Sequence, residues 1–364
     1  MKTLEPAEQQ FFHVEWESTL KCNLDCSYCG DGHDNTQPHP SLNKCLETVD
    51  FIFEYVSLYL DTYPNNSDKV MKHVNLNVYG GESLFHPQIL DILKYIKEKR
   101  KEYDFSVAIS TITNAVVGKK HWKKIIPNLD HITVSYHAES TPKQKTIVKN
   151  NILHLQENKK NFQVSCMMHP RHWEECVDMV EWCREHEIKV IPRQIDSKWS
   201  DFRFNYTEEQ KNWLYGTCDN CPKTKILDKL SYVLKNGIDL SSKVRECCGR
   251  VPFYIDENYD STTTVVENKF KGWNCSVNRF FLYIRQTTGQ VFTNKDCRQN
   301  LENKIGPLGY LNNTDEILEN TRQKIKNKED FIKCQKTSCW CGMCAPKSKD
   351  SDVFKKIMEK YQDD

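Results

Sequence analysis

The sequence lacks the features of a membrane-spanning, secreted or nucleic-acid-binding protein. It contains no run of about 18 apolar residues that could cross a bilayer. Residues 1–12, MKTLEPAEQQFF, are polar and acidic, with no charged start followed by an apolar stretch, so they are not a signal peptide. The net charge of +1 gives no strong electrostatic reason to bind nucleic acid or a membrane. We expect a cytoplasmic protein without nucleic-acid or membrane partners.

Internal repeats and low-complexity tracts are also absent from the sequence, and its 364 residues are enough for roughly two globular domains. Cysteine, by contrast, is abundant, with 17 residues. A secreted disulfide protein would more commonly be small and carry an even number of cysteines. The odd number and the grouping of the cysteines therefore favour metal binding over disulfides.

The first group is Cys22, Cys26 and Cys29, with the spacing C-x3-C-x2-C. These offsets would place all three on one face of a helix, so a buried helical stripe is the alternative interpretation. The flanking residues favour a loop: residues 12–19, FHVEWEST, are typical of a strand, and residues 23–30 include Asn, Asp, Ser and Gly. Three thiolates on a four-iron cluster would leave one iron open for chemistry, whereas a closed site normally has four protein ligands.

Strand and helix patterns alternate over the first two hundred residues. The sequence predicts strands at about 12–19, 73–82, 105–115, 131–140, 162–170 and 188–196. It predicts helices at about 42–63, 87–103, 119–129, after Thr141 and at 172–187. About six β/α units predict an α/β fold with a parallel sheet or partial barrel. Right-handed crossovers place the strand ends on one rim, where such folds carry their active sites.

The segment CNLDCSYC, followed after the next predicted strand by Gly80, Gly81 and Glu82, resembles the radical S-adenosylmethionine superfamily. The resemblance covers roughly residues 11–205 and implies a partial (β/α)6 TIM-like barrel. It implies that Cys22, Cys26 and Cys29 bind a [4Fe–4S] cluster, whose fourth iron is chelated by S-adenosylmethionine. Reductive cleavage of this cofactor would give a 5′-deoxyadenosyl radical that removes a hydrogen atom from a substrate.

Further cofactor contacts follow from the resemblance. Tyr28 would lie beside the adenine, and Glu82 would meet the amino group of the methionine moiety. Gly80 and Gly81 would let the backbone approach the cofactor, because they carry no Cβ. Read without the resemblance, the same residues could simply form a strand-to-helix turn.

Three later strand ends supply the remaining predicted contacts. Asn114 lies in TNA, which resembles the TNG of the family with alanine where glycine is usual. Ser135 matches a polar residue near the ribose or carboxylate, and Arg193 could meet the cofactor carboxylate. The alternative for Ser135 and Arg193 is an ordinary buried or rim polar residue. No catalytic residue is assigned.

A second group of cysteines lies near the C-terminus. Its members are Cys275, Cys297, Cys334, Cys339, Cys341 and Cys344. Cys275 and Cys297 flank a predicted hairpin with strands at 280–286 and 290–294. The region resembles the SPASM or twitch extension of radical S-adenosylmethionine enzymes, which implies a small Cys-rich domain of hairpin and helix. We expect one auxiliary [4Fe–4S] cluster there, held by Cys275, Cys297 and two of the other four cysteines. The alternative is a structural zinc knuckle that uses Cys341 and Cys344.

The remaining cysteines give weaker signals. Either of two pairs, Cys218 with Cys221 or Cys247 with Cys248, could supply a ligand to a second auxiliary cluster. Cys166, in the middle of a predicted strand, could face the barrel interior as a hydrogen-atom donor. Three others read as small core residues, namely Cys45, Cys176 and Cys183. The expected domains are a barrel at 1–205, a bridging segment at 206–270, an auxiliary-cluster domain at 271–346 and a terminal helix at 347–364.

The resemblance favours a peptide or protein substrate, and a one-electron donor of the flavodoxin or ferredoxin type. Only 21 residues precede Cys22, too few for an N-terminal peptide-recognition domain. Alternatives are therefore a small-molecule substrate, such as a sugar alcohol or nucleotide, or an iron–sulfur electron carrier without catalysis. The substrate cavity is expected at the loops after Thr19, Tyr79, Asn114, His137, His169 and Gln194. Residues 197–216 are expected to cover it, with Trp199, Phe202 or Phe204 near the substrate.

Overall fold

The computed structural model describes residues 9–29, 34–60, 71–195, 206–216, 271–293, 307–334 and 347–348. Six parallel strands form its centre: β1 (Gln9–Thr19), β2 (Met71–Gly80), β3 (Ser106–Thr113), β4 (His131–His137), β5 (Phe162–Met168) and β6 (Val190–Gln194). The helices are α1 (Leu42–Leu60), α2 (Ile89–Lys99), α3 (Lys119–Ile125), α4 (Pro142–Glu157), α5 (Trp173–Glu185) and α6 (Glu208–Gly216). The predicted partial α/β barrel is confirmed.

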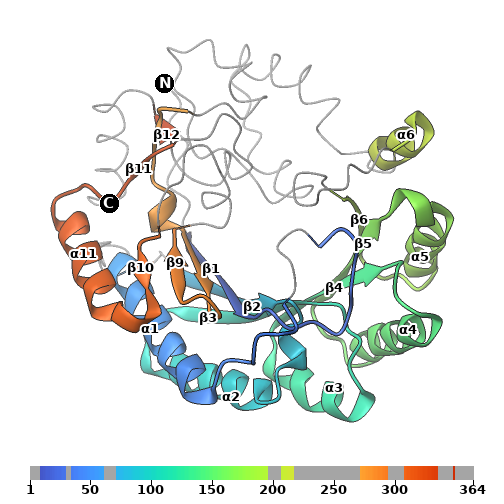
Figure 1. Cartoon of the computed structure of the whole chain (residues 1–364), viewed down its shortest axis with the longest axis horizontal. Helices are drawn as coiled ribbons and strands as arrows, with labels where there is room; N and C mark the ends of the chain where they lie inside the picture. The colour runs from blue at the N-terminus through green and yellow to red at the C-terminus, as the bar shows by residue number, and fades with distance from the viewer. Residues whose placement is uncertain are drawn as a thin grey trace.

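Alternation along each strand decides which face the helices cover. In β4, Ile132, Val134 and Tyr136 are buried, whereas Thr133 and Ser135 on the other face are only half-buried. The Tyr136 hydroxyl donates to Glu175 of α5 at 2.6 Å, which identifies the buried face as the one toward the helices. Helices α1 to α5 lie along the convex side of the curved sheet (Figure 1).

Helix α4 begins where the sequence predicts. The Thr141 side chain accepts from the Gln144 amide, and the Gln144 side chain accepts from the Thr141 amide, which completes a capping box. Pro142 occupies the first turn, where its missing N–H costs nothing. A cap of this kind stabilises a helix by about 1 kcal/mol. In the part of the chain that the structure describes, no helix has the length and apolar character needed to cross a bilayer.

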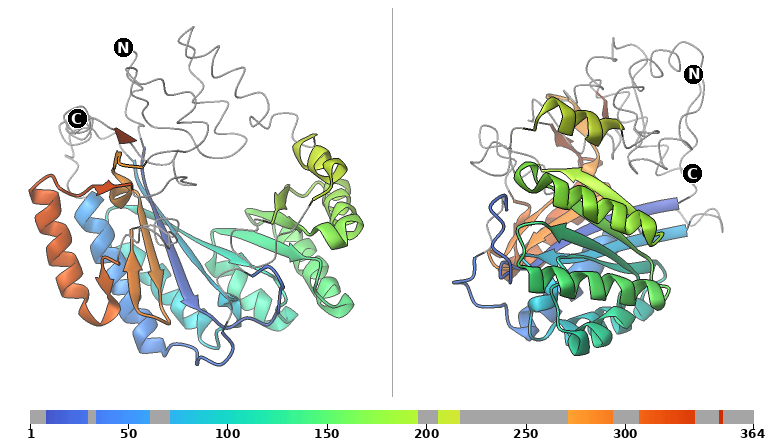
Figure 2. Two further views of the ribbon diagram at one scale, coloured as in Figure 1. Left: turned by 45° about the horizontal axis from the view of Figure 1, so that its top comes forward. Right: turned by 90° about the vertical axis from the view of Figure 1, so that its right-hand side faces the viewer.

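The C-terminal hairpin extends the barrel sheet. Strand β8 (Phe281–Arg285) pairs in parallel with β1, and β9 (Gln290–Phe292) and β10 (Gly309–Tyr310) follow in antiparallel order. The sheet therefore has nine strands in the order β10-β9-β8-β1-β2-β3-β4-β5-β6. Figure 2 shows the orange C-terminal strands beside the blue first strand. Helix α11 (Thr314–Lys326) packs beside α1, and its buried face joins the same apolar core.

A second, three-stranded sheet lies apart from the barrel strands. It consists of β7 (Asn274–Cys275) between β11 (Ile332–Lys333) and β12 (Lys347–Ser348). The described part of the predicted domain 271–346 thus divides between this small sheet and the barrel extension. The expected boundaries at 205, 270 and 346 fall at residues outside the described ranges, so the division into domains stays a prediction.

Cys166 does not face the barrel interior, and the expectation that it could donate a hydrogen atom there is wrong. Its side chain is fully buried on the helix side of β5, where its thiol donates to the Cys176 carbonyl of α5 at 3.5 Å. The same strand alternation that exposes Ser165 to the inner face turns Cys166 outward. The other three predicted core cysteines, Cys45, Cys176 and Cys183, are buried as expected.

Candidate active site

The loop that carries the first three cysteines follows β1 directly. Cys22 and Cys26 are half-buried and Cys29 is exposed. The Cys22 amide donates to Asn35 Oδ1 at 3.0 Å, and the Cys29 amide donates to the Cys26 carbonyl at 3.0 Å. The loop is therefore held both by its own turn and by the segment that leads into α1.

Gly80 and Gly81 bring the end of β2 against the start of this loop. A Cβ on Gly80 would lie 2.2 Å from the Thr19 carbonyl oxygen, and one on Gly81 would lie 2.5 Å from the carbonyl oxygens of Leu20 and Lys21. The Gly81 amide donates to the Thr19 carbonyl at 2.8 Å. Both glycines are thus required for backbone packing just before Cys22, a role that the sequence analysis did not assign. Their approach to the cofactor stays a prediction.

Glu82 is buried beneath the loop. Its carboxylate accepts hydrogen bonds from the Leu84 amide at 3.0 Å, the Thr113 hydroxyl at 2.9 Å and the Asn114 amide at 2.7 Å. Burial raises the pKa of Glu82 to about 7, and the three donors oppose this shift. The carboxylate therefore joins the ends of β2 and β3 and holds a titratable charge between them.

Asn114 connects the end of β3 to the cysteine loop. Its side-chain amide donates to Asn23 Oδ1 at 2.8 Å and lies 3.7 Å from Cys22 Sγ. Asn23 in turn donates to the Val116 carbonyl at 2.7 Å. Ala115 has a φ of 55°, in the left-handed region that glycine adopts most easily, so the alanine of TNA stands in a conformation that favours glycine.

The three cysteines fit a polynuclear iron–sulfur group. Cys22 Sγ accepts from the Leu24 amide at 3.4 Å, the kind of N–H contact that stabilises cluster thiolates. A cavity of about 410 Å³ borders the loop. It is lined by residues 22–26 of the loop, by Asn35, and by residues 139–141 and 144 around the start of α4. Burial is the main cause that raises the pKa of Cys22 to about 11 and that of Cys26 to about 12, and the neighbouring thiols add to the shift. Metal binding must therefore displace protons from these thiols.

Tyr28 points inward and contacts the end of β4. Its hydroxyl lies 2.7 Å from His137 Nδ1, and the two rings stack with centroids 5.9 Å apart. Cys26 Sγ lies 3.5 Å from the same nitrogen. Burial lowers the pKa of His137 to about 4, so the imidazole is neutral at physiological pH. Sequence reasoning placed His137 at the rim but did not predict this contact.

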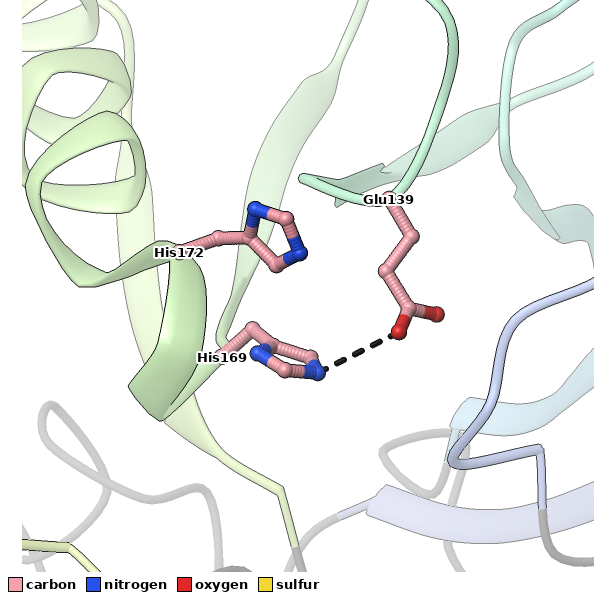
Figure 3. A group of neighbouring side chains, drawn as sticks. All are labelled: Glu139, His169 and His172. Atoms are coloured by element: carbon pink, nitrogen blue, oxygen red, sulfur yellow. Dashed lines mark ion pairs between the residues drawn. The ribbon is translucent and has the colours of Figure 1, made fainter.

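Glu139, His169 and His172 form a polar group beside the cysteine loop (Figure 3). Sequence reasoning placed His169 at the rim but did not predict this group. Their ligand-type atoms all lie within 4.8 Å of one another, close enough for one metal ion. His169 follows β5 and is buried, and its Nε2 lies 3.3 Å from a Glu139 oxygen. The residues come from two strand ends about thirty positions apart in sequence, and only the His169-x2-His172 spacing was visible beforehand.

Ser135 and Arg193 lie on the strand face away from the helices. Ser135 is opposite Ser165 of β5, and Arg193 is opposite Met167. Residues paired across neighbouring strands share a face, so Ser135 and Arg193 lie on the same face as Ser165 and Met167. This is the concave side, because Cys166 between them packs under α5. Arg193 is exposed at the end of β6. This placement is compatible with the predicted cofactor contacts but does not test them.

Two cysteines of the C-terminal group come together in the small sheet. Cys275 of β7 and Cys334, directly after β11, are buried in one apolar cluster with Trp273 and Val277. The Cys334 amide donates to the Trp273 carbonyl at 2.8 Å, so both thiols extend from the same face of the sheet. Their predicted partners, Cys297, Cys339, Cys341 and Cys344, lie outside the described residues, as do Cys218, Cys221, Cys247 and Cys248.

The described part of the segment at 197–216 packs against α5. The Tyr206 hydroxyl donates to the Met168 carbonyl at 2.7 Å and accepts from the Ile195 amide at 2.9 Å. Trp213 of α6 meets the Trp173 ring at the start of α5, with centroids 5.4 Å apart. Trp199, Phe202 and Phe204 lie outside the described residues, so closure of the barrel by this segment stays a prediction.

Comparison with sequences gives no assignment, since no family model and no curated protein matches this chain. Solved structures do match its fold. Native anSMEcpe with bound AdoMet and Kp18Cys peptide has a TM-score of 0.51 at 12% identity, over 97% of this chain and 96% of that chain. Native anSMEcpe with bound AdoMet has a TM-score of 0.50 at 12% identity, over 96% of each chain. These likenesses establish a shared fold.

Streptococcus suis SuiB bound to S-adenosylmethionine is also similar, with a TM-score of 0.48 at 11% identity over 82% of this chain. The present chain spans 63% of the length of SuiB.

Proposed function

We propose that this chain is a radical S-adenosylmethionine enzyme that modifies a peptide or protein. The observation that carries the proposal is the packing of the cysteine loop onto two neighbouring strand ends. Glu82 N–H donates to the Lys21 carbonyl at 2.7 Å, and Asn114 reaches Cys22 Sγ. Three cysteines, a buried carboxylate and an amide side chain thus converge at the carboxyl rim of the barrel, where parallel α/β folds bind their ligands.

Cys22, Cys26 and Cys29 would hold a [4Fe–4S] cluster, and the chelating S-adenosylmethionine would complete its fourth iron. When bound, these groups supply a one-electron cleavage of the sulfonium and removal of a hydrogen atom from the substrate. The residues proposed to hold the cofactor are Tyr28, Gly80, Gly81, Glu82, Asn114, Ser135 and Arg193.

The protein residues bind, orient and exclude water. Glu82 would bind the ammonium group of the cofactor. Hydrogen bonds from Thr113 and Asn114 hold its carboxylate in one position. Tyr28 is held against His137, which fixes the aromatic ring that would border the adenine. The concave strand face, with Ser135 and the polar residues of β2 and β3, would orient the substrate near the reacting carbon.

A peptide substrate is the preferred finer assignment. A solved structure with the same fold holds a Kp18Cys peptide together with AdoMet. One auxiliary [4Fe–4S] cluster is proposed at Cys275 and Cys334, with further ligands among Cys297, Cys339, Cys341 and Cys344. The electron would come from a flavodoxin or ferredoxin, since the cleavage consumes one electron that the chain does not itself supply.

The test is anaerobic reconstitution followed by incubation with dithionite and S-adenosylmethionine. Wild-type protein should bind about eight irons, four for each of two clusters, and release 5′-deoxyadenosine. The triple variant with Cys22→Ala, Cys26→Ala and Cys29→Ala should keep about four irons. It should release no 5′-deoxyadenosine. Cys45→Ala, which removes a thiol from the barrel core, is the control and should release 5′-deoxyadenosine like wild type. Cofactor cleavage by the triple variant would refute the assignment.

Iron and zinc analysis separates the auxiliary-site alternatives. A Cys275→Ala and Cys334→Ala double variant should lose the second set of about four irons and retain the first. Tightly bound zinc in the purified wild-type protein, together with only about four irons, would instead support a zinc knuckle.

A further inference from the structure

Glu139 holds the cysteine loop from the end of β4. Its two oxygens accept from one residue: the Ser27 amide donates to Oε2 at 2.7 Å, and the Ser27 hydroxyl donates to Oε1 at 2.5 Å. Ser27 directly follows Cys26 and lies two residues before Cys29. A carboxylate that accepts both donors of one residue fixes the position and the orientation of that residue, because both bonds form together in only one placement of the loop.

His169 supports Glu139 from the next strand. Its Nδ1 accepts from the Arg171 amide at 3.1 Å, so the proton of the neutral ring resides on Nε2. Nε2 lies 3.3 Å from Glu139 Oε1, which places an N–H toward the carboxylate (Figure 3). Burial lowers the pKa of His169, which favours this neutral form. The His169 ring also packs 5.7 Å from the Tyr28 ring, centroid to centroid.

These hydrogen bonds argue against a metal ion at Glu139, His169 and His172, although the spacing permits one. A metal ion on His169 Nε2 would require the ring proton to be on Nδ1. Nδ1 instead accepts a hydrogen bond from the Arg171 N–H, so it cannot carry a proton. Glu139 would also have to exchange its bonds to Ser27 for the ion. The Arg171 amide thus occupies His169 Nδ1, and Ser27 occupies Glu139. The contacts connect the end of β5 through the end of β4 to the cysteine loop.

We propose that Glu139 is a positioning residue that fixes Ser27 and places a carboxylate beside the cluster that Cys22, Cys26 and Cys29 would hold. This inference rests on the proposed function. A fixed negative charge near the cluster opposes the addition of an electron and so lowers the reduction potential. Glu139 is only half-buried in the described structure, and its charge is partly shielded from solvent by His169 and the loop.

The potential is measured by redox titration followed by electron paramagnetic resonance on reconstituted protein. Glu139→Gln removes the charge and should raise the midpoint potential of the first cluster. Glu139→Asp keeps the charge but shortens the reach to Ser27, and Ser27→Ala removes only the hydroxyl contact. Both should leave the potential closer to that of wild type than Glu139→Gln does. Glu185→Gln, an exposed carboxylate at the end of α5, is the matched control. An unchanged potential in Glu139→Gln would overturn the claim of tuning.

Positioning is tested without any cluster by hydrogen exchange on the metal-free protein. Glu139→Ala should speed amide exchange in a peptide that contains Ser27, and Glu185→Ala should not. Equal exchange in wild type and Glu139→Ala would overturn the positioning role. If the purified wild-type protein contains zinc and His172→Ala loses it, the three residues form a metal site and the proposal is overturned. Absence of iron and of S-adenosylmethionine cleavage in wild type would refute the proposed function, whereas the exchange result would still decide the positioning role.

Discussion

Glu82 carries its charge where solvent does not reach it. Its three hydrogen-bond donors come from its own turn and from the end of β3, and they lower the cost of ionisation without cancelling the effect of burial. A pKa of about 7 means that this carboxyl group changes its charge in the physiological range. In the folded apoprotein, ionisation of Glu82 therefore lowers the free energy of unfolding as pH rises from 4.5, the ordinary value, to about 7.

Binding of S-adenosylmethionine should weaken as the pH falls through 7. The ionised fraction of a group with this pKa falls from about nine-tenths at pH 8 to about one-tenth at pH 6, so affinity should fall by up to about tenfold. Isothermal titration calorimetry on cluster-loaded protein at both pH values measures the effect. Glu82→Gln should bind more weakly at pH 8 and lose most of the pH dependence. A wild-type affinity that does not change between pH 6 and 8 would contradict a role for the Glu82 charge.

Residue-scale contacts were predicted only where they lie within a short motif. The three cysteines and Glu82 were found because their spacing is local, and Asn114 because it ends a strand in a recognisable tripeptide. The contact between Glu139 and His169 was missed because it depends on β4 and β5 being neighbours with matched ends. A carboxylate in one loop and an imidazole in another carry no joint signal until the strand order is known.

At the scale of elements, the turn after β2 determines where the cysteine loop lies. Gly81 is surrounded by backbone rather than by side chains, so a larger residue cannot be accommodated by a rotamer change. The carbonyl groups that it would meet belong to the two residues before Cys22. Gly118, which directly precedes α3, has open surroundings instead, since no heavy atom lies within 4 Å of the position of a Cβ on it.

Gly81→Ala should therefore displace the cysteine loop while the barrel stays folded. We expect a loss of about 1–3 kcal/mol in the free energy of unfolding, and loss of the first cluster upon reconstitution. Gly118→Ala, with a φ of −61° that alanine adopts freely, should keep full iron loading and lose no more than about 1 kcal/mol at the N-cap of α3. Thermal unfolding and iron analysis of the two variants make the comparison. Full iron loading in Gly81→Ala would show that the close approach is not required.

The β/α units were predictable because each helix and strand has its own period, and strands β1 to β6 end close to the predicted positions. The hairpin strands were also predicted, near β8 and β9. Their pairing with β1 was not, because alternation shows which face of a strand is buried and not which strand lies beside it. The sequence separation between β1 and β8 exceeds 250 residues, so no local pattern could indicate that contact.

At the scale of the molecule, the near-zero net charge conceals a local concentration of positive charge. Helix α3 has the sequence KKHWKKI, with exposed Lys119, Lys120, Lys123 and Lys124 and no acidic residue. Its first turn lies near the cysteine loop, since Asn23 donates to the Val116 carbonyl three residues before Lys119. An acidic electron-transfer protein that approached this face would be attracted by the lysines toward the cluster site.

Charge reversal on α3 should slow electron delivery by such a partner. We expect Lys119→Glu combined with Lys120→Glu to reduce the rate of cluster reduction by a reduced flavodoxin about tenfold or more at low ionic strength, with a smaller effect as salt screens the charges. Reduction by photoreduced 5-deazaflavin, a small uncharged donor, should be unaffected.

Lys324→Glu combined with Lys326→Glu on α11 changes the net charge equally and serves as the control, with wild-type rates expected from both donors. If both double variants slow flavodoxin equally, net charge alone accounts for the effect and α3 is not the docking face. If neither does, the donor approaches elsewhere, and the assignment of the cysteine loop is untouched.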